Sequence, residues 1–335
     1  GSQLLLNNSK GIPNATVELQ GNTQVVCWKN AQTLYLGGLS GSSSTALCGA
    51  DKKNNSATMK WIVGGANTDE TFDGVIDNRC SSGGYNGKTS VEKIGTGDWR
   101  LNGKNIHSGT TTVSGGRLIV NGQLAGTGDV IVNSGGTLAG KGQTSSTGII
   151  AGRVTVNSGG ILSVGDTVFN NKDVLTLSKG VTINKGGRIE VPLYKKETLN
   201  KAPQFKLNAN SSINGTLVLD MENVTVDVVP NSSFQLFSLA KGVVLDGTLE
   251  GIEPAIPQEG KQWDTSQLFS TGKIYVRTDE YMTQVKNLEP HPDHVEYYTL
   301  DGQKSVTIGS AKSQLLIERT VKTDGSVSIN KVYVK

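Results

Sequence analysis

A Gly-Gly pair flanked by alternating apolar segments recurs four times in the middle of the chain, and this repeat constrains the fold more than any other feature. The pairs are Gly115-Gly116, Gly135-Gly136, Gly159-Gly160 and Gly186-Gly187. Their second glycines are 20, 24 and 27 residues apart. Glycine supplies the positive φ of a tight turn without a Cβ clash. A period of this length is typical of one coil of a β-solenoid, in which each coil buries its apolar side chains against its neighbours.

The composition agrees with many short strands and turns. The chain has 43 glycines and 8 prolines in 335 residues, with no Gly-X-Y period, which excludes a collagen helix. Glycine also disfavours long helices. The formal net charge is +3, and there is no basic block of the kind that binds nucleic acid. No apolar run approaches the roughly 20 residues of a membrane-spanning helix.

These patterns predict an all-β chain, with a right-handed β-helix (β-solenoid) followed by a small C-terminal β-sandwich. The expected boundaries are residues 3–278 for the β-helix and 279–335 for the sandwich, with irregular coils over 3–101, regular repeats over 102–191 and a capping region over 192–278. In the sandwich, Asp301-Gly302 and Asp324-Gly325 each lie between alternating runs, which predicts two hairpins.

The three cysteines all lie in the first quarter of the chain, at Cys27, Cys48 and Cys80. One pair can form a disulfide and leave one thiol, or all three can be small buried residues, and the sequence leaves both open. No Cys-x-x-Cys pair is present, so the sequence gives no support to a zinc or redox motif.

Part of the chain resembles the autotransporter-associated β-strand repeat. The resemblance is carried by the segments Gly95–Gly103, Ser108–Val113 and Gly116–Gly122, continues in Gly135–Gly140 and Leu162–Asp166, and ends with the closing-type motif Trp263–Leu268. Val164 stands where the family usually has proline in its Leu-Ser-Pro-Gly group. The resemblance implies a passenger-like β-helix that is secreted or displayed on the outer cell surface.

The tail resembles the C-terminal sorting domain of Bacteroidota type IX secretion cargo. The matching segments are Tyr297–Gly302, Asp324–Val327 and Lys331–Lys335, whereas Ser313–Ile317 departs from the usual Gly-Ile-Tyr stretch. This resemblance implies that the secretion machinery is a partner. Proteins of this build often carry an upstream catalytic domain, frequently a polysaccharide lyase, which we expect before Gln3.

An acidic group is the best candidate for metal or acid–base chemistry. Its members are Asp69, Glu70, Asp73 and Asp77. Asp69, Asp73 and Asp77 could bind Ca²⁺, or the group could act with Arg79 or Lys88 as the base of a lyase. Strand alternation instead places Asp73 and Asp77 opposite Phe72 and Ile76, on a solvated face. We expect no other cofactor.

Four aromatic residues are candidates for stacking on sugar rings, namely Tyr85, Trp28, Trp61 and Trp99. Trp61 and Trp99 lie in alternating runs, which also fits a place in the core or at a coil edge. His107 stands before a Ser-Gly turn, and we expect an exposed turn histidine.

The sequence therefore predicts a non-catalytic β-helical stalk, the C-terminal portion of a larger secreted or surface-exposed polysaccharide-targeting protein. The stalk would display an upstream domain and contact polysaccharide, without nucleic-acid partners or a membrane span. Two alternatives remain open at this point. One is a pectate-type polysaccharide lyase, and the other is a carbohydrate-binding or adhesin module that uses loops in residues 37–90.

Overall fold

The computed structural model is nearly all β, with 52% of residues in strands and 2% in helix. It describes residues 1–27, 32–50, 58–79, 87–196, 199–280, 294–298, 304–305, 314–321 and 327–334. The chain forms two compact units, Gly1–Val276 and Arg277–Lys335, which we call unit 1 and unit 2. The predicted all-β class and the parallel β-helix are confirmed.

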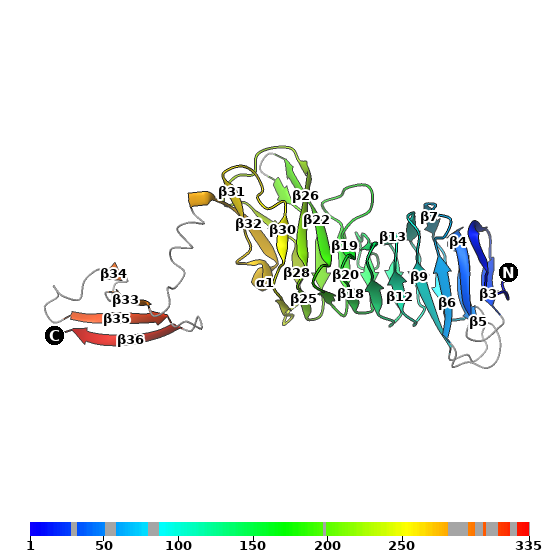
Figure 1. Ribbon diagram of the computed structural model, residues 1–335, viewed down its shortest axis with the longest axis horizontal. Helices are drawn as coiled ribbons and strands as arrows, with labels where there is room; N and C mark the ends of the chain where they lie inside the picture. The colour runs from blue at the N-terminus through cyan, green and yellow to red at the C-terminus, as the bar shows by residue number, and fades with distance from the viewer. Residues whose placement is uncertain are drawn as a thin grey trace. The chain divides into compact units, whose positions relative to one another are not determined.

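Unit 1 is built from coils that stack along one direction, each contributing strands to three parallel ladders (Figure 1). The first ladder begins at the N-terminal half of β4 (Thr33–Gly41) and continues through β6 (Thr58–Val63), β9 (Lys88–Lys93), β12 (Thr111–Val113), β15 (Val130–Val132), β18 (Val154–Val156), β21 (Val181–Ile183), β25 (Ser211–Ile213) and β29 (Leu245–Asp246).

The second ladder shares β4 with the first and carries the candidate site. It runs through β2 (Ile12–Leu19), β4, β7 (Glu70–Phe72), β10 (Asp98–Leu101), β13 (Gly116–Val120), β16 (Gly136–Ala139), β19 (Ile161–Ser163), β22 (Arg188–Lys196), β26 (Thr216–Val224) and β30 (Gly251–Glu253). A short strand, β23 (Leu199–Lys201), folds back antiparallel on β22.

The third ladder consists of a four-stranded and a six-stranded sheet. The first contains β1 (Gln3–Leu5), β3 (Gln24–Cys27), β5 (Ala46–Ala50) and β8 (Val75–Asp77), and the second contains β11 (Lys104–Asn105), β14 (Gln123–Leu124), β17 (Ile149–Ile150), β20 (Val174–Leu177), β24 (Gln204–Leu207) and β28 (Phe237–Leu239). The two sheets meet where the Ile106 N–H donates to the Ile76 carbonyl at 2.8 Å.

The strand register shows why the Gly-Gly spacing varies. Thr111 pairs with Val130, Val130 with Val154, and Val154 with Val181, so successive coils take 19, 24 and 27 residues. Gly116 pairs with Gly136 in the second ladder, so the first two Gly-Gly turns stack directly. The added residues of the longer coils lie between their second-ladder and third-ladder strands, namely in the connections from β16 to β17 and from β19 to β20.

The core is a set of aligned apolar rows inside the coils. One row contains Val113, Val132, Val156 and Ile183, and each side chain is fully buried. Each buried Val or Ile contributes about 1.5–3 kcal/mol relative to an exposed one. Because a single coil has no core of its own, this burial requires stacking.

Asparagine side chains tie the corners of successive coils together. The amide of Asn157 donates to Asn133 Oδ1, and the amide of Asn184 donates to Asn157 Oδ1, each at 3.0 Å. The adjacent glycine turns are linked as well, with the Gly159 N–H donating to the Gly186 carbonyl of the next coil at 2.8 Å. These bonds satisfy polar groups that strand pairing leaves over at the corners.

After the parallel stack comes a short three-stranded sheet, two strands of which pair antiparallel. This sheet contains β27 (Ser233–Gln235), β32 (Lys273–Thr278) and β31 (Lys261–Asp264), and the short helix α1 (Leu268–Thr271) follows β31. The rings of Phe234 and Trp263 meet edge to face, with their centroids 6.5 Å apart. Among the described residues, no helix is long and apolar enough to cross a bilayer.

Unit 2 contains an antiparallel sheet with the strand order β34 (Lys304–Ser305), β33 (His294–Tyr298), β35 (Gln314–Val321) and β36 (Val327–Val334). Tyr298 pairs with Lys304, and Val321 pairs with Val327. Both strand pairs lie where Asp301-Gly302 and Asp324-Gly325 predict hairpins.

Candidate functional site

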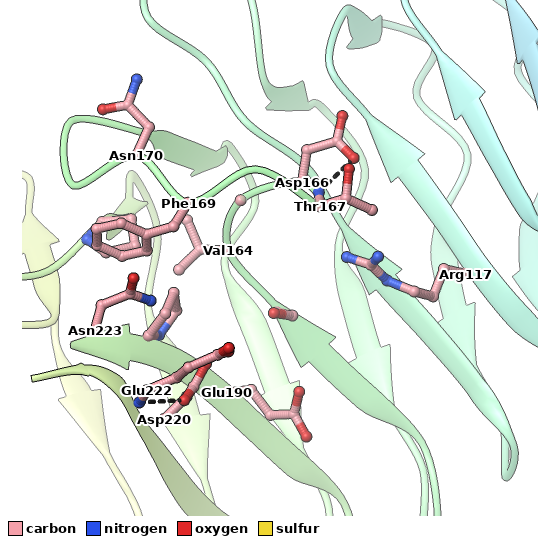
Figure 2. A pocket seen from close by; sticks show the side chains of 14 residues that line it. Arg117, Val164, Asp166, Thr167, Phe169, Asn170, Glu190, Asp220, Glu222 and Asn223 are labelled. Carbon is pink, nitrogen blue, oxygen red and sulfur yellow. Dashed lines mark hydrogen bonds between the residues drawn. The ribbon is translucent and has the colours of Figure 1, made fainter. Parts of the chain in front are cut away.

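A cavity of about 200 Å³ opens on the second ladder of unit 1. It lies where the segment Val164–Asn170, which connects β19 to β20, passes beside β22 and β26 (Figure 2). Arg117 of β13 also lines it, so residues from four coils form one site. We call this the segment cavity.

One wall of the segment cavity is apolar. Phe169 and Val164 extend from the segment toward Asn223 of β26 in Figure 2. The Phe169 ring stacks on Tyr194 of β22, with centroids 5.7 Å apart and an angle of 14° between the rings. Pro192 adds a further apolar surface. The stacked pair fixes an aromatic ring that is itself only partly buried.

The strand side of the cavity carries three carboxylates, from Glu190, Asp220 and Glu222 (Figure 2). Asp220 is placed by pairing with Pro192, and its Oδ1 accepts the Glu222 backbone N–H at 2.9 Å. Burial raises the pKa of Glu190, and the negative charge of Asp220 adds to this shift. The surface is therefore acidic, with the Arg117 guanidinium on the opposite side of the opening in Figure 2.

Asp166 anchors the segment to earlier coils. Its Oδ1 accepts from Arg100 Nε at 3.2 Å, its Oδ2 accepts from the Asn121 amide at 3.0 Å, and Lys141 Nζ lies 3.6 Å from Oδ2. Burial alone would raise the Asp166 pKa, but the hydrogen bonds from Asn121 and Thr167 and the nearby cations lower it below its ordinary value. Asp166 is thus an ionised anchor, not a free acid.

The acidic residues predicted from sequence accept hydrogen bonds within the stack. Asp69 Oδ1 accepts the Asp98 backbone N–H at 2.8 Å, and Asp73 Oδ1 accepts from the Asn102 amide at 2.7 Å. Asp77 Oδ1 accepts the Asn78 backbone N–H at 2.6 Å. In the part of the chain that the structure describes, no three His, Cys, Asp or Glu side chains gather as metal ligands. Calcium binding by these residues stays a prediction.

Two of the four aromatic candidates lie in the core. Trp61 and Trp99 are 0% and 1% exposed, and their indole N–H groups donate to the Cys48 and Leu39 carbonyls at 2.8 and 2.9 Å. Their rings fill the interior of the wide early coils and present no open face to a sugar. Trp28 and Tyr85 lie outside the described residues.

The expectation for His107 is wrong, because this side chain is buried and only 4% exposed. Its Nε2 lies 2.8 Å from Thr111 Oγ1, and burial lowers its pKa to about 4.

The structure answers part of the question of whether two of the three cysteines form a disulfide. Cys48 is in a disulfide, and Cys27 is buried with its Sγ 3.8 Å from Asn7 Oδ1, while Cys80 lies outside the described residues.

No motif in the sequence singles out Phe169, Glu190, Asp220 or Glu222. One signal was present, since the 27-residue step between the last two Gly-Gly pairs marks extra chain around Phe169. The three carboxylates give no such signal, because they line a cavity only where the segment crosses the second ladder.

Comparison with known families gives one match. A family model described as a passenger-associated-transport-repeat matches residues 84–120, which contain the strands from β9 to β13. The match supports an autotransporter-associated repeat in this chain and suggests a secreted or surface passenger-type region. No curated protein matches the chain.

Proposed function

We propose that unit 1 is a non-catalytic β-helical stalk of a secreted or surface-exposed protein. The observation that carries this proposal is the parallel stacking itself, which continues from β2 to β30 in the second ladder. A stack of this kind holds its two ends apart at a fixed separation, because successive coils are hydrogen-bonded to each other along parallel ladders. The passenger-associated repeat match supports the same role.

The chemistry of the described carboxylates favours a structural role. Asp69, Asp73 and Asp166 each bind groups on an earlier or later coil, and so they join coils. The disulfide at Cys48 supports an oxidising compartment, because disulfides persist mainly in secreted and periplasmic proteins.

The finer parts of the proposal come from the sequence. The tail's resemblance to type IX sorting domains supports export by a Bacteroidota-type secretion machinery, with unit 2 as the recognised part. The stalk would then present a polysaccharide-active domain outside the cell. The antiparallel sheet of unit 2 is compatible with such a sorting role.

The test is an activity panel with the full chain. Neutral and acidic polysaccharides are incubated with the protein, with and without Ca²⁺, and products are followed by the absorbance of unsaturated uronates and by new reducing ends. The stalk predicts no product with any substrate. Turnover that disappears in Asp69→Asn or Asp73→Asn, but not in the exposed control Asp246→Asn, would overturn the stalk and favour the lyase. Glycan binding without turnover is compatible with the stalk.

A further inference from the structure

We propose that the segment cavity of unit 1 binds an amino-sugar unit of a glycan, with Phe169 as the stacking surface and the carboxylates on β22 and β26 as partners for the hydroxyl and ammonium groups. This inference does not depend on the stalk function, because it rests on the lining of one cavity. Neither the family match nor the sequence resemblance assigns a ligand to it.

The cavity has the size of a single sugar ring. Its volume of about 200 Å³ lies below the roughly 300–1,000 Å³ of pockets for drug-sized ligands. A pyranose ring has one apolar face of C–H groups and a rim of hydroxyls. Phe169, backed by Tyr194, offers an aromatic surface for the apolar face.

The polar lining can bind the hydroxyl rim. Asn223 carries both an amide donor and a carbonyl acceptor, and the carboxylates of Asp220 and Glu222 accept hydrogen bonds. Asp220 is held by its bond to the Glu222 backbone N–H, which leaves its second oxygen for a ligand. A sugar seated on Phe169 therefore meets acceptors on the strand side, where Figure 2 shows these side chains.

The charge of the lining selects among sugars. Three carboxylates, from Glu190, Asp220 and Glu222, face one guanidinium from Arg117, while Asp166 is neutralised by Arg100 and Lys141. Burial and the neighbouring Asp220 raise the pKa of Glu190, and Arg188 and Arg117 offset only part of this rise, so the charged form of Glu190 is destabilised. An ammonium group would relieve that repulsion, whereas a uronate would increase it. The lining thus favours a glucosamine-type unit over a uronic acid.

The frame of the cavity is fixed before any ligand binds. Asp166 holds one end of the segment to β10 and to residues that follow β13 and β16, and Gly165 N–H donates to the Gly140 carbonyl at 2.8 Å. At the other end, the Phe169–Tyr194 stack holds the segment to β22. Little ordering is needed on binding, which favours affinity for a small ligand.

The experiment is a titration of the full chain with three hexasaccharides by isothermal calorimetry. They are a glucosamine hexamer, its N-acetylated form and an oligogalacturonate, at about pH 5.5, where amines and most carboxylates are charged. We expect the glucosamine hexamer to bind at least about tenfold more tightly than the other two, with an affinity that falls as salt rises. Phe169→Ala and Asp220→Asn should each weaken it by about tenfold.

Matched controls separate the site from the rest of the surface. Val168→Ala changes the exposed neighbour of Phe169, and Asp246→Asn removes an exposed carboxylate outside the cavity; neither should change the affinity. Circular dichroism and the thermal midpoint verify that each variant folds. The proposal is overturned if the glucosamine hexamer does not bind, if the N-acetylated or uronate oligomer binds as tightly, or if the controls weaken binding as much as Phe169→Ala does.

Discussion

His107 shows how a buried titratable residue makes a stacked coil sensitive to acid. The side chain is 4% exposed, and its Nε2 is bonded to Thr111 Oγ1. Burial lowers its pKa to about 4, against 6.5 for an unperturbed histidine. The folded chain therefore holds His107 neutral over a pH range in which the unfolded chain protonates it.

This difference between the folded and unfolded pKa of His107 predicts that the free energy of unfolding depends on pH. Because the folded pKa lies below the unfolded pKa, the unfolded state takes up the extra proton, and acid favours unfolding. The contribution of His107 is constant above about pH 6.5, and the free energy of unfolding falls by up to about 3 kcal/mol as the pH drops from about 6.5 to about 4. Urea denaturation of the wild type and of His107→Gln across this range measures it, and the variant should show a smaller decrease.

His294→Gln is the matched control for this prediction, since it makes the same change in unit 2. It should leave the pH dependence of unit 1 unchanged. If His107→Gln and the wild type lose stability in parallel as the pH falls, His107 is not the group responsible, and the assignment of the buried neutral imidazole is wrong.

The same residue shows where sequence reasoning fails. Strand positions alternate, so the burial of Phe72 and Ile76 and the exposure of Asp73 follow from the pattern. A corner residue has no such alternation, and the sequence around His107 indicates a turn but not which side faces the core. Lys93 of β9 is a different case, because its position follows the alternation but its charged side chain is unusual in a core. It continues an alternating run into the interior, where its Nζ donates to the Ile94 carbonyl at 2.7 Å.

At the level of elements, the segment Val164–Asn170 explains a break in the alternation of two strands. Ile119 and Ala139 lie on the outward face of β13 and β16, in the same faces as the partly exposed Arg117 and Thr137, yet both are fully buried. The segment crosses this part of the ladder through the Gly140–Gly165 bridge. It therefore acts as a cover for outward apolar residues.

The Asp166 side chain anchors this segment to earlier coils. Loss of its charge should therefore make the segment more mobile. Asp166→Asn keeps the size of the side chain but loses the charge that pairs with Arg100 and Lys141. We expect a loss of about 2 kcal/mol in the free energy of unfolding, since hydrogen bonds to a charged group in a mostly buried place are lost. Amide hydrogen exchange should also quicken within the segment. Asp246→Asn, at an exposed carboxylate, should change neither quantity.

A result in which Asp166→Asn unfolds like the wild type would contradict the role of the anchor. The sequence could not have supplied this role, because Asp166 belongs to a family-like Leu-Ser-Val-Gly-Asp group whose side-chain partners come from coils 45 and 66 residues away in the sequence. The repeat predicts that coils stack. It does not predict which inserted residues fold back, because insertions differ in length from coil to coil and carry no period.

At the level of the whole chain, the Gly-Gly pattern predicts that the coils of unit 1 stack, but not how far the stack continues. The stacking of the Gly-Gly turns follows from their spacing, and the pairing of Gly116 with Gly136 confirms it. Parallel coils continue to β30, beyond the last Gly-Gly pair, although coil length rises until Ser211 pairs with Leu245. Ile213 of β25 and the alternating Leu217 and Leu219 of β26 are buried, and they continue the stack without a Gly-Gly pair.

If each coil bonds mainly to its neighbours, unit 1 should tolerate the removal of one whole coil but not of part of one. Deletion of residues 111–129 removes β12, β13 and β14 and lets Val91 of β9 pair with Val130 of β15, because both already pair with Thr111. We expect a cooperative thermal transition with a modestly lower midpoint, since one coil's burial and the Asn121–Asp166 bond are lost. Deletion of residues 111–120 removes β12 and β13 but keeps β14, and it should abolish the transition, because the first two ladders then skip a coil that the third retains. Equal losses from the two deletions would show that unit 1 folds as one indivisible unit and would refute the modular description.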